Sequence, residues 1–405
     1  MKYADNLAIA RPALLKDFFF GPLGLALKPR VVTPRTGEPS TSKTHLAMFH
    51  DVPEAREMVQ LLAHRATAAK VLTTYVKGFL KHLRPDGRFH ASYMLFVGTL
   101  FDDDDDVSGA RTSRTSAKDP AVQTIPKHWK DKTGPNWPKK LRQCFVAPPG
   151  HVLWSTDAAQ GELKIAACLA DEPTMLQAYR AGLDLHALTG AAMLDMQYEA
   201  FLDLARADPE QFELGRFKAK AANFGMLYLV SARGFARYAW DNYRMVLSVA
   251  EAQAMIDKFF ARYPGLLAWH ERTKQAARRD GYVVSPLGVV RHLPLIKSRD
   301  AALASRAERQ AVNSPVQSTL SNLTEWALVE IEKHIPEAPL CAMIHDAGMG
   351  YCPEDRAEEL GKRIVEVASS LPTEQKFGWK PQLELTFDFE HGPDMGSMTK
   401  MKRVG

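Results

Sequence analysis

The sequence has few cysteines and no apolar run long enough to cross a membrane. Its four cysteines form no C-x-x-C pair, so we expect free thiols in a reducing compartment. They are Cys144, Cys168, Cys341 and Cys352. The apolar stretch 18–27 is interrupted by glycine and proline, is too short to span a bilayer, and lacks a secretory cleavage pattern. We therefore predict a cytoplasmic protein that does not bind a membrane.

The sequence also lacks a strong charge imbalance and an apparent internal repeat. Its 405 residues carry a formal net charge of +5, with a pI near 8.8. Such a mild excess of positive charge permits a polyanionic partner without requiring one. The length suffices for two or three substructures with a sizeable core.

One helical stretch carries cations followed by aromatic residues. Arg216, Lys220, Phe224 and Tyr228 are spaced four apart, so they drift only about 40° per step around a helix and form one stripe. A triphosphate followed by a flat base would match this order of side chains. From this stretch alone, a solvated basic turn followed by core aromatics is an equal alternative.

Two acidic residues stand where predicted strands end. Residues 151–155 alternate like a strand, Asp157 ends it, and 162–169 show helical spacing. Residues 340–352 predict two short strands with Asp346 at the tip of the hairpin. Taken singly, an aspartate that caps a helix or occupies a tight turn is commonplace.

Helical spacing predicts most of the remaining structure. We expect one or two helices over 53–83, mainly helices over 176–278, and a hairpin over 281–294. A further helix is predicted over 301–333, which Pro315 should break or kink.

Two segments have distinctive charge. The acidic block Asp102–Asp106 is expected to be a solvated loop, with a metal site as the less favoured alternative. Residues 127–142 interleave six Lys or Arg with two tryptophans, an arrangement that can bind phosphates and pack on a sugar or base. A loop kept soluble by lysines explains that segment equally well.

Taken in order, the motifs resemble those of family A DNA polymerases, the DNA polymerase I type. The first catalytic motif of that family resembles LRQCFVAPPGHVLWSTD followed by AAQGEL, the second resembles the Arg216–Tyr228 stripe, and the third resembles MIHDA. Further stretches match in order and approximate spacing: TSRTSAKDPAVQTIP, DLHALTG and ERQAVNSPVQSTLSN. The resemblance covers about residues 39–385.

The resemblance implies an α+β, right-hand polymerase fold, with an antiparallel-sheet palm, helical fingers and a truncated thumb. The expected divisions are a thumb remnant over 1–95, the first part of the palm over 96–183, fingers over 184–300 and the second part of the palm over 301–405. The implied function is template-directed DNA synthesis, in which a dNMP is added to a primer 3′-hydroxyl. The implied partners are primer–template DNA and dNTPs.

The resemblance also implies a role for each matched residue. Asp157 and Asp346 would be the catalytic pair and would hold two Mg²⁺ ions, for which Mn²⁺ can substitute. Glu162 would crowd the sugar 2′ position and favour deoxyribonucleotides. The other residues expected to bind the nucleotide are Arg216, Lys220, Phe224, Tyr228, His186 and Gln160. Those expected to contact DNA are Arg114, Gln123, Arg309, Asn313, Gln317 and His345.

Departures from the family pattern leave alternatives open. Ala347 stands where the family usually has Glu, so a catalytically silent subunit that binds primer and template is one alternative. A single-subunit RNA polymerase is another, although relatives of that type lack the glutamate at the position of Glu162. We expect no proofreading exonuclease in this chain, which can be one half of a split enzyme with a separate exonuclease or thumb subunit or a processivity factor. The compact arrangement suits a bacterium or a phage-infected cell.

Overall fold

The computed structural model describes residues 11–33, 36–94, 114–126, 136–228, 231–243, 245–344 and 346–401. The acidic block Asp102–Asp106, most of the Lys/Trp segment and His345 lie outside these residues. By its contacts the chain divides into two units, residues 1–89 with 126–141 and residues 90–125 with 142–405. This division does not test the predicted boundaries at 95, 183 and 300, which stay predictions.

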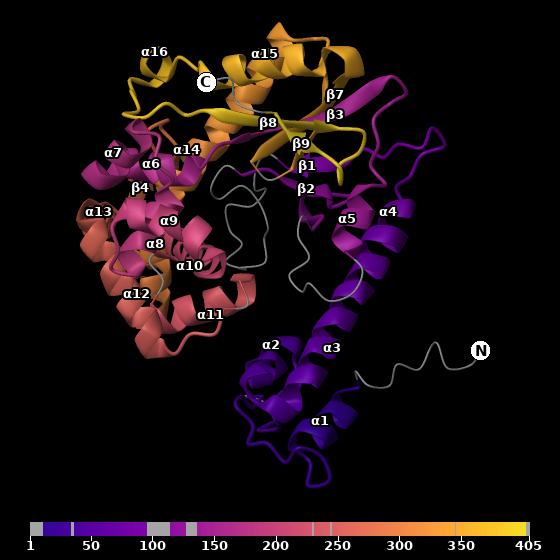
Figure 1. The fold of residues 1–405 in the computed structure, drawn as a ribbon, viewed down its shortest axis with the longest axis vertical. Helices are drawn as coiled ribbons and strands as arrows, with labels where there is room; N and C mark the ends of the chain where they lie inside the picture. Colours follow the sequence, from indigo (N-terminus) through magenta and orange to yellow (C-terminus); the bar gives the residue numbers. More distant parts are fainter. Residues whose placement is uncertain are drawn as a thin grey trace. The chain divides into compact units, whose positions relative to one another are not determined.

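The first unit is helical, and its helices up to the start of α3 pack around an apolar cluster that contains Phe19, Phe49 and Val59. Its N-terminal helices are α1 (Pro12–Phe20), α2 (Lys43–Leu46), η2 (Ala47–Asp51), α3 (Pro53–Lys70), η3 (Val71–Lys77) and α4 (Gly78–Leu80). Proline opens α1 and α3, where its fixed φ suits the first helical turn. The helix predicted over 53–83 is confirmed, and α3 leads through η3 into α4 as a long rod (Figure 1).

The second unit contains a five-stranded antiparallel sheet, which we call the palm sheet. Its strand order is β6-β7-β3-β8-β9. The strands are β3 (His151–Ala158), β6 (Leu340–Ile344), β7 (Ala347–Pro353), β8 (Phe387–Gly392) and β9 (Thr399–Lys400). Helix α15 (Ala357–Ser369) covers one face of the sheet (Figure 1). On that face Trp154, which is fully buried, packs with Leu328 and Leu360.

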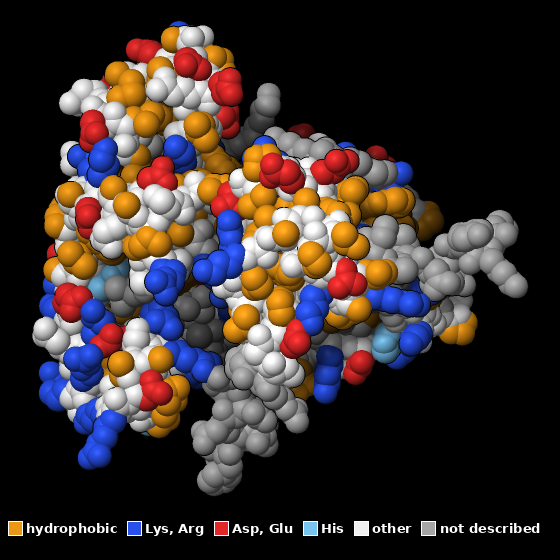
Figure 2. Space-filling model, turned by 90° about the horizontal axis from the view of Figure 1, so that it is seen from below, with side chains coloured by type: hydrophobic (Ala, Val, Ile, Leu, Met, Phe, Trp, Pro, Cys, Tyr) orange, Lys and Arg blue, Asp and Glu red, His pale blue; other side chains and the backbone are white. Residues whose placement is uncertain are grey.

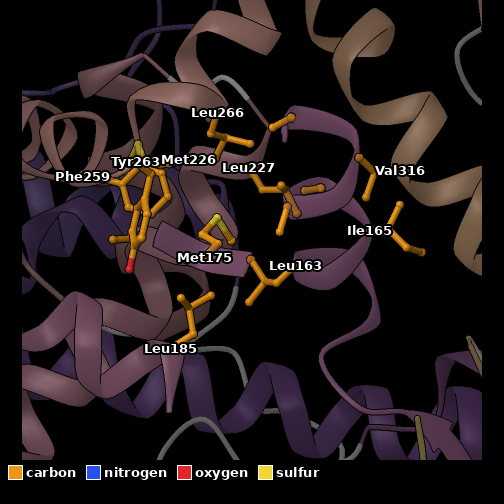
Figure 3. Packing of buried hydrophobic residues seen from close by; sticks show 14 of the residues in the cluster. Leu163, Ile165, Met175, Leu185, Met226, Leu227, Phe259, Tyr263, Leu266 and Val316 are labelled. Carbon is orange, nitrogen blue, oxygen red and sulfur yellow. The ribbon is translucent and has the colours of Figure 1, made fainter. Parts of the chain in front are cut away.

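Most other helices of this unit share a second core. They are α6 (Gly161–Ala170), α7 (Pro173–Arg180), α8 (Leu185–Met193), α9 (Tyr198–Ala207), α10 (Pro209–Leu227), α11 (Ala232–Tyr243), α12 (Val249–Arg262) and α13 (Pro264–Asp280). Leu163 of α6, Met226 of α10 and Phe259 of α12 meet in this core (Figure 3). The expectation of mainly helical structure over 176–278 is confirmed.

Short elements complete the chain. They are β1 (Ser92–Met94), β2 (Ser116–Lys118), η4 (Val122–Thr124), α5 (Trp137–Arg142), β4 (Tyr282–Val284), β5 (Val290–His292), η5 (Pro294–Lys297), η6 (Glu354–Arg356) and α16 (Thr373–Phe377). The pairs β1–β2 and β4–β5 are antiparallel, and the second is the hairpin predicted over 281–294. No helix among the described residues is sufficiently long and apolar to span a membrane.

The long helix α14 (Ala301–His334) runs through Pro315 without a break. Of the two predicted effects of Pro315, a break is excluded and a kink stays a prediction. A proline inside a helix costs about 3 kcal/mol because it removes one backbone hydrogen bond. Here α14 places Ala311, Val316 and Leu328 in three different apolar clusters. The apolar burial along the whole helix outweighs that local cost.

Close packing at Gly350 fixes how β7 sits in the palm sheet. A Cβ at this position would lie 2.2 Å from the Pro339 carbonyl oxygen and 2.5 Å from the Trp154 ring. Neither group can move away easily, because one is backbone and the other is a fully buried indole. Only glycine therefore fits this strand position.

We predict that Gly350→Ala lowers the free energy of unfolding by about 3 kcal/mol through overpacking. Urea unfolding followed by tryptophan fluorescence measures it. Gly78→Ala is the control, because a Cβ there meets its first neighbour only at 3.4 Å and alanine favours helix over glycine by roughly 0.5–1 kcal/mol. Equal stability of Gly350→Ala and the wild-type protein would show that the strand can shift to make room.

Candidate active site

The palm sheet brings Asp157 and Asp346 together. Asp157 is the last but one residue of β3 and pairs with Ala347, the first residue of β7. Asp346 directly precedes Ala347, between the end of β6 and the start of β7. The predicted hairpin with Asp346 at its tip is confirmed, and two acids far apart in the sequence meet at one end of adjacent strands.

A third acid that the sequence analysis missed lies on the other side of Asp157. Asp388 of β8 pairs with Asp157, and residues directly opposite each other on antiparallel strands point to the same face. Lys400 of β9 forms an ion pair with Asp388 at 2.6 Å. The alternation of apolar and polar residues in Leu385–His391 signals the strand, but only the register with β3 reveals the pairing.

Arg114 connects two of the predicted site residues. Its guanidinium donates to both carboxylate oxygens of Asp346, with Nε–Oδ1 at 3.2 Å and Nη2–Oδ2 at 2.6 Å. Nη2 also donates to Glu162 Oε1 at 2.5 Å. The side chains of Asp346 and Glu162 are only 17% and 13% exposed. Arg114 thus neutralises two partly buried acids that would otherwise repel each other.

Tyr228 links the end of α10 to the same group. Its hydroxyl donates to Glu162 Oε2 and also interacts with the side chain of Gln317 on α14. Burial, reinforced by the charge of Glu162, raises the pKa of Tyr228, so the phenol stays protonated and remains a donor. A continuous series of hydrogen bonds therefore runs from Tyr228 through Glu162 and Arg114 to Asp346.

The stripe predicted on α10 reaches the surface of the helix. Lys220 is exposed and Arg216, Phe224 and Tyr228 are partly exposed, whereas positions 221–223 and 225–227 are buried. Phe217, between Arg216 and Lys220, is also exposed. Arg216 is held by Asp184, with Nε–Oδ2 at 2.9 Å and Nη2–Oδ2 at 2.8 Å. A cationic start and an aromatic end thus face outward along one helix.

His186 sits beside this stripe in a buried hydrogen-bond network. The Thr189 hydroxyl lies 2.9 Å from Asn223 Oδ1, which orients the amide so that Nδ2 donates to His186 Nδ1 at 2.7 Å. Burial lowers the pKa of His186 to about 4, so the ring is neutral at pH 7. With Nδ1 accepting, Nε2 carries the proton and is a donor.

Three predicted DNA contacts form a stripe on α14. Arg309, Asn313 and Gln317 follow each other at four-residue spacing. Arg309 is exposed and donates to Ser305 Oγ at 3.0 Å, while Asn313 Oδ1 is buried without a partner among the described residues. The last residue of the stripe, Gln317, interacts with the side chain of Tyr228 on α10.

Gln123 and Gln160 each form hydrogen bonds within the second unit, Gln123 as a buried residue and Gln160 as an exposed one. Gln123 is buried, and its amide donates to Thr115 Oγ1 at 3.0 Å and to the Met343 carbonyl oxygen at 3.4 Å. Gln160 begins α6 in a left-handed conformation with φ of 53°, and its Oε1 accepts from the Tyr179 hydroxyl at 2.9 Å. In this state Gln123 holds β2 and β6 together, and its predicted contact with DNA stays a prediction.

Glu325 is a further acid that the sequence analysis missed. Helix α14 packs directly on β7, since a Cβ at Gly348 would lie 2.1 Å from the Leu328 side chain. Glu325, one turn before Leu328, is therefore brought near Asp346. Burial, together with the charge of Asp346, raises the pKa of Glu325 from 4.5 to about 7.

The donor set at the end of the palm sheet fits hard divalent cations. Mg²⁺ prefers carboxylate oxygens and keeps several waters, so it needs few protein ligands. Asp157 and Asp346 are the best placed, and the Arg114 guanidinium stands in for a cation at Asp346. Within the described ranges, no three His, Cys, Asp or Glu side chains already converge as a complete metal cluster.

We predict that Glu325→Gln flattens the pH dependence of stability. A carboxyl whose folded pKa is about 7 against 4.5 unfolded loses stability as pH rises between those values. In EDTA, the Tm of the wild-type protein should fall more between pH 5 and pH 8 than the Tm of the variant. The variant should therefore be the more stable of the two at pH 8.

The matched control is Glu366→Gln, an exposed acid on α15. It should leave the wild-type pH profile unchanged. Parallel profiles for the wild-type protein and Glu325→Gln would show that Glu325 titrates normally in the folded chain.

Three comparisons place this geometry among known proteins. The family model for DNA polymerase family A matches residues 1–395. DNA polymerase I of Pseudomonas aeruginosa is 32% identical over 370 residues, which are 90% of this chain and 36% of that protein. The thermostable DNA polymerase I of Thermus filiformis is 32% identical over 372 residues, 90% of this chain and 40% of that protein.

A solved structure shows the same fold. The POL domain of Pol1 from M. smegmatis, in complex with DNA primer-template and dNTP, superposes with a TM-score of 0.76 at 23% identity. The superposition covers 96% of this chain and 61% of that one. The α+β architecture with its antiparallel palm sheet is therefore that of a polymerase domain. This chain spans well under half of the curated relatives it matches, 36% and 40% of their lengths, and it belongs to DNA polymerase family A.

Proposed function

We propose that this chain carries out template-directed DNA synthesis, adding a dNMP to the 3′-hydroxyl of a primer. The observation that carries the proposal is the placement of Asp157 beside Asp346, connected by hydrogen bonds to the end of the cationic and aromatic stripe on α10. Nucleotidyl transfer needs these groups together, because the attacked α-phosphate must lie between the primer end and a held triphosphate.

Asp157 and Asp346 would hold Mg²⁺. When bound, two such ions lower the pKa of the primer hydroxyl and neutralise charge on the leaving pyrophosphate. The two aspartates would fix the position of this chemistry, because Asp157 lies on β3 and Asp346 directly precedes β7, the strand paired with it. Asp388, opposite Asp157 and paired with Lys400, adds negative charge on the same side.

The stripe on α10 would receive the incoming nucleotide. Arg216 and Lys220 bring positive charge for the triphosphate. Neutral His186 would add a neutral N–H donor toward phosphate. Phe224, partly exposed one turn beyond Lys220, would stack on the base.

Glu162 would select the sugar. Its carboxylate accepts a hydrogen bond from the Tyr228 hydroxyl as well as from Arg114, and the bond to Tyr228 alone would limit its movement away from a nucleotide. A ribose 2′-hydroxyl meeting this fixed group would clash or lose its solvation. We infer that deoxyribonucleotides are the preferred substrates.

The stripe of Arg309, Asn313 and Gln317 on α14 would contact the primer–template. Donors on such a stripe can bind the acceptors that every base pair offers in the minor groove, and so test pair shape without reading sequence. The face shown in Figure 2 carries many Lys and Arg side chains, which suits a polyanionic partner. The M. smegmatis domain was solved with DNA primer-template and dNTP, which supports the same partners here.

We predict that Asp157→Asn and Asp346→Asn each reduce primer extension at least a thousandfold. Removal of a carboxylate that holds a divalent cation forfeits several kcal/mol of transition-state stabilisation. The measurement is single-nucleotide extension of a labelled primer–template with Mg²⁺ and then with Mn²⁺. Binding of the primer–template should change far less.

Glu366→Asn on the exposed face of α15 is the control and should extend at the wild-type rate. Extension that persists in both aspartate variants would remove the metal assignment. A wild-type chain that binds primer–template but extends with neither ion would instead be a silent binding subunit. That alternative draws on Ala347, which pairs with Asp157 but brings no oxygen to the site.

We further predict that Glu162→Ala raises the ratio of rNTP to dNTP incorporation by roughly 10–200-fold, the range that one steric contact in a pocket provides. Extension with each nucleotide type, compared in the same preparation, gives the ratio independently of any general loss of rate. Glu199→Ala on the surface of α9 should leave the ratio unchanged. Equal use of both nucleotide types by the wild-type chain would favour an RNA polymerase.

A further inference from the structure

The Arg114 guanidinium binds the carboxylate of Asp346, which is one of the two proposed metal ligands. Its guanidinium donates to both oxygens of Asp346 at 3.2 Å and 2.6 Å, and to Glu162 at 2.5 Å. Of the two predicted metal ligands, Asp346 is thus engaged through its whole carboxylate by a positive charge of the chain itself. A divalent cation must compete with this guanidinium for the same oxygens, and the two positive charges repel.

The groups around Asp346 show that Arg114 largely determines the charge that a divalent cation would meet there. Arg114 is the only cation of the described residues that forms an ion pair with Asp346, and the Glu325 carboxyl on α14 is near enough for the charge of Asp346 to act on it. Without Arg114, the acids Asp346, Glu162 and Glu325 would form a strongly negative site with high affinity for divalent ions. With Arg114 in place, much of that charge is neutralised.

The ion pair between Arg114 and Asp346 can also be exchanged for hydrogen bonds from Arg114 to DNA. The Arg114 side chain is 35% exposed, and partly exposed ion pairs are held by modest free energies. A nucleic acid offers phosphate, sugar and base oxygens that accept from a guanidinium in the same fork geometry as a carboxylate. Arg114 can therefore pass from Asp346 to DNA without losing its hydrogen bonds.

We propose that Arg114 is a positioning residue that sets the order of binding: it masks Asp346 until primer–template DNA draws it away, and only then do divalent cations bind tightly. The inference rests on the proposed function, because it names DNA as the competitor. It predicts that the chain alone binds divalent ions weakly and that DNA raises this affinity.

The test is equilibrium binding of Mn²⁺, followed by electron paramagnetic resonance of the free ion, with no nucleotide and no turnover. Without DNA, Arg114→Gln should bind Mn²⁺ at least about tenfold more tightly than the wild-type chain, since a charge-assisted hydrogen-bonded pair has been removed. Arg114→Lys keeps the charge and should lie near the wild type. With a saturating primer–template that ends in a dideoxynucleotide, the wild-type affinity should rise to within about threefold of Arg114→Gln.

Arg309→Gln is the matched control, because it removes one positive charge from the α14 stripe at a residue whose side chain bonds Ser305. It should not change Mn²⁺ affinity in the absence of DNA. Adding Asp346→Asn to Arg114→Gln should abolish the gain. Circular dichroism of each variant confirms that the fold is retained.

Two outcomes would overturn the proposal. One is an Mn²⁺ affinity of Arg114→Gln without DNA equal to that of the wild type or of Arg309→Gln. The other is a wild-type affinity that DNA leaves unchanged although fluorescence anisotropy shows the DNA bound. Failure of the proposed function would show separately, as absent primer extension. The Mn²⁺ affinities of Arg114→Gln and the wild type without DNA would still show whether Arg114 masks Asp346.

Discussion

The site depends on the register between β3 and β7. Asp157 pairs with Ala347, so the turn residue Asp346 stands next to Asp157 only in this register. Because side chains alternate across a strand, a slip of one residue would turn Asp157 to the opposite face. The register is held away from the acids, where Trp154 packs against Gly350 and leaves no room for a Cβ. Apolar packing in the middle of the sheet thus positions the charges at its end.

A second constraint is the continuity of hydrogen bonds across elements. Tyr228 ends α10, Glu162 begins α6, and Asp346 belongs to the palm sheet, yet Glu162 and Arg114 join all three. A movement of α10 that withdraws Tyr228 would free one oxygen of Glu162 and alter how Arg114 is shared. Under the proposed function, nucleotide binding on α10 would therefore be coupled to the charge at Asp346 through two side chains, Glu162 and Arg114.

The features of the site that depend on local periodicity and turn residues were predicted from the sequence. The hairpin around Asp346, the helix that carries Lys220 and the end of β3 at Asp157 were all legible from local patterns. Asp388 and Glu325 were not, because each owes its place to pairing or packing between segments distant in sequence. The same holds for the bonds of Arg114, since nothing near residue 114 indicates Asp346 as a partner. Pro315 does not break α14, for the related reason that tertiary burial overrides a local rule.

The concentration of acids at one end of the palm sheet is unfavourable for folding and useful for binding. Like charges on neighbouring positions repel, and burial of Glu325 beside Asp346 adds a desolvation cost. Lys400 neutralises the charge of Asp388, and Arg114 neutralises the charges of Asp346 and Glu162. Of the two, Lys400 lies in the paired strand β9, whereas Arg114 reaches the site from outside the palm sheet. The chain therefore has one counter-ion on a strand of the sheet and a second, Arg114, that under our proposal would leave Asp346 when DNA binds and so allow a divalent cation to bind there.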